Sequence, residues 1–63
     1  MSTLPPHSHL PGKRVEWNAD NWGGLATIVR VAYIYHGEPV IEVADDDVRG
    51  TITLMPWEYT LLP

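Results

Sequence analysis

Six aromatic side chains are the feature of this 63-residue sequence best suited to chemistry, and that chemistry is non-covalent contact. The six are Trp17, Trp22, Tyr33, Tyr35, Trp57 and Tyr59. We expect Tyr33 and one Trp to pack in or against the core and the others to be partly exposed, because so short a chain encloses little volume. Exposed Trp and Tyr are typical of binding surfaces, since they bury a large area at a small entropic cost. Packing of the rings over the ends of an undersized core is the alternative interpretation.

Side chains that could catalyse a reaction lack the spacing that catalysis needs. The sequence has no Cys, and its Ser residues, Ser2 and Ser8, both lie near the N-terminus. A nucleophile with an adjacent base therefore has no recognisable candidate. Four carboxylates are expected on outward strand positions or in turns, where solvent stabilises them: Glu16, Glu38, Glu42 and Glu58. We predict no catalytic residue and no enzymatic activity.

Residues that could bind a metal occur in two short runs. His7 and His9 flank a Ser in a Pro-containing segment, but the sequence offers only His36 and no Cys to complete a zinc site. The second run, residues 45–47, is three Asp that lack the spaced ligands of a calcium loop and fall where a hairpin needs turn residues. We predict no metal and no cofactor. The three carboxylates could instead contact a basic partner.

The charge balance argues against nucleic acid as the partner. Eight acidic and four basic residues give a net charge of −4, and the basic residues are too scattered to form a stripe along the phosphates. The N-terminal residues lack the basic and apolar regions of a secretory signal, and no apolar run approaches the roughly 20 residues of a membrane-spanning helix. We expect a soluble protein, and the absence of Cys is compatible with a reducing cytoplasm.

Residues 12–63 have the alternating pattern of a small all-β domain. The predicted strands cover residues 13–17, 25–35, 40–44, 51–55 and 60–62. Their predicted inward residues include Val15, Ile41, Val43, Ile52 and Leu54. Both faces of the long strand are largely apolar, so we expect this strand to bend and to serve the core from opposite sides at its two ends.

Turn-forming residues separate these strands. Residues 18–24 predict a loop in which Gly23 and Gly24 supply positive φ angles. Hairpin turns are predicted over residues 36–39 and 45–50.

The order of these elements favours an all-β, five-stranded SH3-like small barrel over residues 12–63. A 3₁₀ turn over residues 56–59, begun by Pro56, precedes the last strand, and no segment has helical periodicity. A five-stranded OB-type barrel is the alternative architecture. Residues 1–11, which contain three Pro, predict a flexible, disordered tail.

The motifs GKRV, NWGG, TIV, PVIEV and GTITLMP resemble, in the same order, those of the plasmid-encoded type II dihydrofolate reductases. The resemblance implies an SH3-like fold, and in that family a homotetramer whose central pore binds NADPH and dihydrofolate. The Val-Gln-Ile-Tyr run that lines this pore would correspond to residues 52–55, where Thr53 replaces the Gln and Met55 the Tyr. A hydroxyl and a thioether do not reproduce the hydrogen bonds of an amide and a phenol. The family's basic residue would fall near Glu16 or Trp17. These differences change residues of the family's active site, whereas the residues that determine the fold are retained.

A second, shorter likeness concerns PWEYTLL, which resembles the Pro-x-x-Tyr segment of peptide-binding SH3 domains. It implies that Pro56 and Tyr59 line a groove for proline-rich peptides.

We therefore predict a small, non-enzymatic interaction module that is oligomeric or an accessory subunit. The predicted partner-binding residues are Trp17, Trp22, Tyr35, Thr53, Met55, Trp57, Glu58 and Tyr59. The partner is another protein or a second copy, and carboxylates at Glu16, Asp20 and Glu58 favour a basic or proline-rich segment. The LPPHSHLP run of the chain itself could occupy such a groove. The alternatives are a reductase of the type II kind and a weak nucleic-acid-binding barrel.

Overall fold

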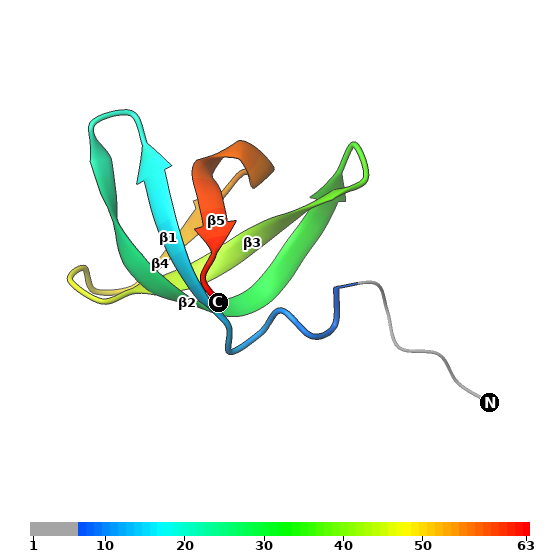
Figure 1. The fold of residues 1–63 in the computed structure, drawn as a ribbon, viewed down its shortest axis with the longest axis horizontal. Coiled ribbons are helices and arrows are strands. Elements are labelled where there is room, and N and C mark those ends of the chain that lie inside the picture. The colour runs from blue at the N-terminus through cyan, green and yellow to red at the C-terminus, as the bar shows by residue number, and fades with distance from the viewer. Residues whose placement is uncertain (1–6) are drawn as a thin grey trace.

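The computed structural model describes residues 7–63, which form one five-stranded antiparallel sheet (Figure 1). The elements are β1 (Arg14–Ala19), β2 (Trp22–Tyr35), β3 (Glu38–Asp45), β4 (Thr51–Leu54), the 3₁₀ helix η1 (Pro56–Glu58) and β5 (Tyr59–Leu61). The strand order is β4-β3-β2-β1-β5, so β4 and β5 are the two edges and the sheet does not close. The predicted all-β class is confirmed, and the described residues contain no α-helix.

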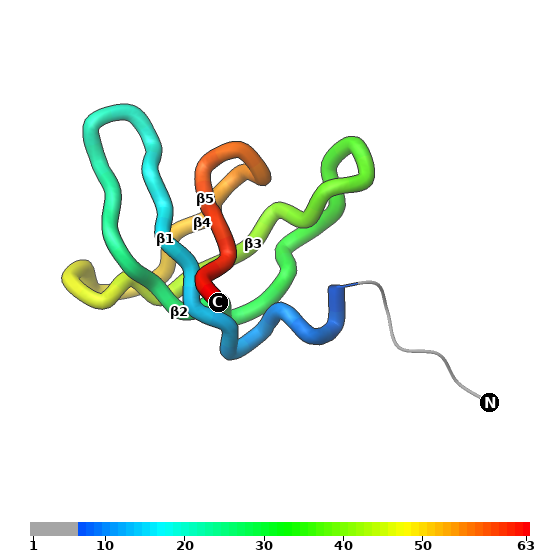
Figure 2. Tube along the Cα trace, viewed as in Figure 1, coloured from blue at the N-terminus to red at the C-terminus, as the bar shows by residue number. Residues whose placement is uncertain are grey.

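β2 bends because it carries two extra residues relative to β3. The β2–β3 register shifts once between Ile28 and Arg30 and again between Val31 and Tyr33, which leaves Val29 and Ala32 as bulged residues. A bulge kinks its strand and increases the local twist. Figure 2 shows the result: β2 descends from one hairpin, curves through the base of the fold and rises into the other. The predicted bend of the long strand is confirmed.

The core lies in the concave side of this coiled sheet. Val15, Ile41, Val43 and Leu54 are buried there as predicted, and Ile52 packs against them while partly exposed. Ile28 from the first half of β2 joins the same cluster.

Leu10 lies in the core, whereas the sequence predicted a flexible tail that extends to residue 11. It is only 2% exposed and belongs to the core cluster, because a large apolar side chain at this position closes the base of the sheet. The surrounding backbone is bonded to the sheet: Gly12 N donates to Ile28 O at 2.8 Å, and Ile28 N donates to Lys13 O at 2.8 Å. The part of the expected tail that covers residues 1–6 lies outside the described residues.

The loop predicted over residues 18–24 is wrong. β1 continues to Ala19, the turn consists of Asp20 and Asn21 alone, and both glycines lie inside β2 without positive φ angles. Asp20 itself takes the left-handed conformation, with φ 55°, which a short polar side chain tolerates.

The other two predicted hairpin turns are confirmed. His36 (φ 50°) and Gly37 (φ 80°) form a two-residue turn with positive φ at both positions, the geometry of a type I′ hairpin. The β3–β4 turn covers residues 46–50 and ends at Gly50, with φ 88°.

The predicted 3₁₀ turn is also confirmed, with Pro56 at its first position. Glu58 closes it from both sides: its backbone N donates to Met55 O at 2.9 Å, and its carboxylate Oε1 accepts from Met55 N at 2.8 Å. η1 therefore holds Trp57, its middle residue, in a defined position.

Candidate contact surface

The outer face of the sheet collects several of the predicted contact residues. Ile41 and Val43 of β3 face the core cluster, so Val40 and Glu42 lie on the opposite, outer face of the strand, where Val40 is nonetheless covered and 0% exposed. Directly paired residues of antiparallel strands share a face. Tyr33 pairs with Val40, Tyr35 with Glu38, and Thr53 with Glu42. The register therefore places both tyrosines and Thr53 on the outer face of β2–β3–β4.

At the end of this face four large side chains form an exposed group, which we call the aromatic patch: Tyr33, Tyr35, Met55 and Trp57. The rings of Tyr35 and Trp57 lie 6.0 Å apart between centroids at an interplanar angle of 68°. The Tyr33 hydroxyl donates to the Met55 sulfur at 3.8 Å. Trp57 is 69% exposed, Tyr33 51% and Tyr35 41%. Two separate contacts thus join β2 to the chain around η1, and both leave aromatic surface in solvent.

Tyr33 was expected in the core, and that expectation is wrong. Simple alternation places it with Val29 and Val31 on one face. The two bulges interrupt this alternation, and Tyr33 instead pairs with Val40 on the outer face.

Trp17 is a correction to the predicted contact surface, because its ring is not exposed. It is 7% exposed and belongs to the core cluster. Its partner across β1–β2 is Gly24, and an added Cβ at Gly24 would lie 3.5 Å from the indole nitrogen of Trp17. That distance is an ordinary contact, and the closest atom to such a Cβ would be Asp45 Oδ2, at 3.3 Å. The indole Nε1 donates to the same Asp45 Oδ2 at 2.6 Å. Sequence pattern alone did not predict the Trp17–Gly24 pair, because the pair depends on the register of the β1–β2 hairpin.

Tyr59 and Glu58 carry structural contacts as well as lying beside the aromatic patch. The Tyr59 hydroxyl donates to the Pro39 carbonyl at 2.8 Å. Burial raises the pKa of Tyr59, and the negative charge of Glu38 adds to the rise. The Glu58 carboxylate is held by the Met55 backbone. Both residues therefore shape the patch rather than project freely from it.

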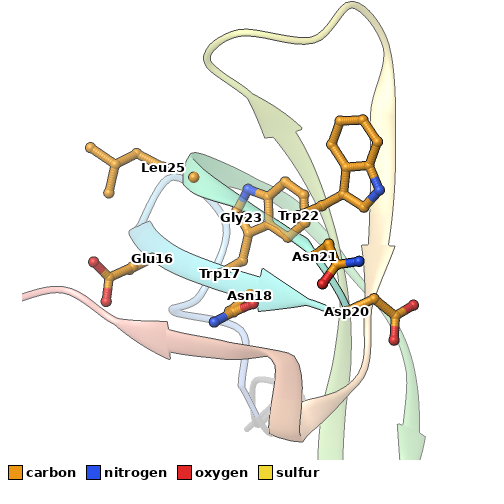
Figure 3. Close-up of a pocket in the computed structure, with 9 residues that line it drawn as sticks. Glu16, Trp17, Asn18, Asp20, Asn21, Trp22, Gly23 and Leu25 are labelled. Carbon is orange, nitrogen blue, oxygen red and sulfur yellow. The ribbon is translucent and has the colours of Figure 1, made fainter.

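Trp22 is the most exposed of the rings, at 73%, but it lies on the other face of the sheet. It pairs with Ala19, whereas Glu16 pairs with Leu25 three positions along the ladder, on the opposite face. An open hollow of about 620 Å³ surrounds this hairpin end. Figure 3 shows Glu16 and Leu25 pointing to one side of the hairpin and Trp22 and Asp20 to the other. The side chains do not converge on a ligand, and Gly23 and Gly24 are among the residues that line the hollow.

Ion pairs neutralise two of the basic residues. Arg14 binds Asp46 through two contacts of 2.9 and 2.6 Å and also donates to the Thr27 hydroxyl at 2.8 Å. Arg30 donates to Glu42 at 2.7 Å, and the Thr51 hydroxyl donates to the other Glu42 oxygen at 3.0 Å.

These contacts shift the pKa values of the acids. The hydrogen bond from Arg14 lowers the pKa of Asp46, while hydrogen bonds from Thr51 and then Arg30 lower the pKa of Glu42. Neither ion pair of the described residues involves Glu38, which lies beside the aromatic patch.

Within residues 7–63, no three His, Asp or Glu side chains gather closely enough to hold a metal ion. None of the described secondary structure is a helix of the length and apolarity needed to cross a membrane. Comparisons of the chain with protein-family models, with curated proteins and with solved structures found no match of any of the three kinds.

Proposed function

We propose that this chain is a small, non-enzymatic protein-interaction module of the SH3-like barrel type, which acts in the cytoplasm as an oligomer or an accessory subunit. Its contact surface is the aromatic patch, extended along β4 by Thr53. The observation that carries the proposal is the Tyr35–Trp57 pair, a 6.0 Å aromatic contact in which Trp57 remains 69% exposed. Large rings held in place but left in solvent are suited to anchoring a partner.

The SH3-like assignment is supported by the strand order, by the bulged long strand and by the 3₁₀ helix before the last strand. In such a fold the aromatic patch would lie on a rigid support. Three of its members come from β2 and η1, and Met55, the fourth, is bonded to Glu58. A pre-organised surface loses little conformational entropy on binding, which favours affinity.

The proposed surface omits four residues of the set predicted from the sequence and adds one. Glu58 and Tyr59 are omitted because their side chains make structural hydrogen bonds. Trp17 is excluded because it is buried, and Trp22 is excluded because it lies on the opposite face. Tyr33 is added because it is exposed beside Met55. The partner is another polypeptide or a second copy of the chain, as a basic or proline-rich segment.

A peptide-library selection on the immobilised protein tests the proposal. We expect enriched peptides to bind the wild-type protein and to lose affinity when the patch is altered by Trp57→Leu. Trp22→Leu is the matched control, because Trp22 is similarly exposed but lies on the other face. Enriched peptides that bind all three proteins equally would overturn the proposed surface, and a selection without enrichment would overturn the proposed function.

A further inference from the structure

Glu38 is an exposed carboxylate at the start of β3, beside the aromatic patch. It is the direct cross-strand partner of Tyr35, which places the two β-carbons about 4.5–5.5 Å apart on one face of the sheet. The negative charge of Glu38 also contributes to the raised pKa of Tyr59. Glu38 is therefore an exposed carboxylate on the same face of the sheet as Tyr35.

Neither ion pair of the described residues involves Glu38, and the nearby imidazole of His36 packs edge-on against Tyr35 with ring centroids 4.3 Å apart. Arg14 and Arg30 are bound to Asp46 and Glu42. Lys13 precedes β1, and Arg49 lies in the β3–β4 turn, at the opposite end of β3 from Glu38. The charge next to the patch is thus negative and available to a partner.

Trp57 supplies the complementary apolar surface. Among aromatic side chains, the indole attracts a cation over its face most strongly. At 69% exposure the Trp57 ring has surface open to a partner, and Tyr35 borders it at 68°. Tyr35 thus contacts Trp57 and is also the cross-strand partner of Glu38, so a cation on the Trp57 ring would lie on the same face as the Glu38 carboxylate.

From this arrangement we propose that the aromatic patch binds one arginine side chain of a partner polypeptide, with the guanidinium stacked on Trp57 and paired with Glu38. The guanidinium fits both elements, because it is planar, stacks on aromatic faces and offers several N–H donors in a fixed fork. An ammonium group offers a point charge without the planar face. The inference rests on the proposed function, since it names the chemistry recognised by the same surface.

A matched pair of peptides tests this step: Ac-Pro-Arg-Pro-NH₂ and its citrulline counterpart, which has a similar shape but no charge. Binding is followed through the indole N–H signal of Trp57 in ¹H–¹⁵N spectra of the full chain. We expect the arginine peptide to shift this signal and to bind about two- to fivefold more tightly than the citrulline peptide, the range for an exposed cation–π contact.

Two variants separate the contributions. Glu38→Gln should weaken the arginine peptide about twofold or more and leave the citrulline peptide unchanged. Asp20→Asn is the matched control, because it removes the same charge at the other hairpin turn, and it should leave both affinities unchanged. Equal binding of the two peptides, or equal effects of the two variants, would overturn the inference.

The outcome also distinguishes this inference from the proposed function. If peptides from the library selection need Trp57 but contain no arginine, the guanidinium inference is wrong and the interaction module stands. If neither those peptides nor the arginine peptide depends on Trp57, both proposals are wrong.

Discussion

Asp45 is a residue at the end of β3 whose carboxylate joins β1 to the β3–β4 turn. Its Oδ2 accepts from Trp17 Nε1 at 2.6 Å, while its Oδ1 accepts from the backbone N of Asp47 at 2.8 Å and of Val48 at 3.1 Å. One carboxylate thus holds the buried indole of β1 and also the start of the β3–β4 turn. Sequence pattern indicated the turn-forming role of this Asp but not its bond to Trp17, because the two residues lie 28 positions apart.

Replacing this carboxylate should cost measurable stability. Asp45→Ala leaves the buried indole N–H of Trp17 without an acceptor, and we expect a loss of about 1–3 kcal/mol in the free energy of unfolding. Urea unfolding followed by Trp fluorescence measures it. Asp47→Ala, two residues along on the exposed part of the turn, is the control and should change stability by less than about 0.5 kcal/mol. Similar losses for the two variants would show that the indole bond contributes nothing.

For the secondary-structure elements, the sequence predicted most strands to within a few residues. It did not predict the positions in β2 where the side chains switch from one face of the sheet to the other. β-Branched runs and turn residues are local signals, and they indicated the long strand, two hairpin turns and the 3₁₀ helix correctly. The bulges at Val29 and Ala32 depend on the pairing with β3, so simple alternation misplaced Tyr33. The two glycines predicted a turn, yet both lie in β2, where Gly24 packs beside the Trp17 ring and the Asp45 carboxylate.

The segment before β1 provides a test at this scale. Leu10 is in the core, so Leu10→Ala should leave a cavity and lower the free energy of unfolding by about 2–5 kcal/mol. Leu25→Ala makes the same chemical change at a strand position that is 43% exposed, and it should cost much less. Chemical denaturation of the two variants compares them directly. Equal costs would mean that residues up to 11 behave as the tail that sequence pattern predicts.

Across the whole molecule, the pKa shifts predict how stability depends on pH. The pKa values of Asp46 and Glu42 are lowered in the folded state, so unfolding takes up protons in acid. Their contribution is present above the ordinary carboxyl range of about 4 to 4.5 and is lost as the pH falls through the lowered values. The raised pKa of Tyr59 acts at the other end, where its contribution is present below about pH 10 and lost as the pH rises beyond it.

Unfolding measurements between pH 7 and pH 3 test the acid side. Asp46→Asn removes the titrating group that Arg14 binds, so we expect a shallower loss of stability below pH 4.5 than in the wild-type protein. Asp47→Asn, an adjacent Asp outside both ion pairs of the described residues, should leave the slope unchanged. If the stability of Asp46→Asn falls equally steeply below pH 4.5, a group other than Asp46 causes the acid dependence.

The proposed function places contact with another polypeptide on the outer face of the sheet, around η1. The most direct measurement is calorimetric titration of one library-selected peptide into the wild-type protein, Trp57→Leu and Trp22→Leu. We expect Trp57→Leu to weaken binding about tenfold or more, as an anchoring Trp does, and Trp22→Leu to change it little. Equal affinities for Trp57→Leu and the wild-type protein, or a loss confined to Trp22→Leu, would rule out the aromatic patch as the contact surface.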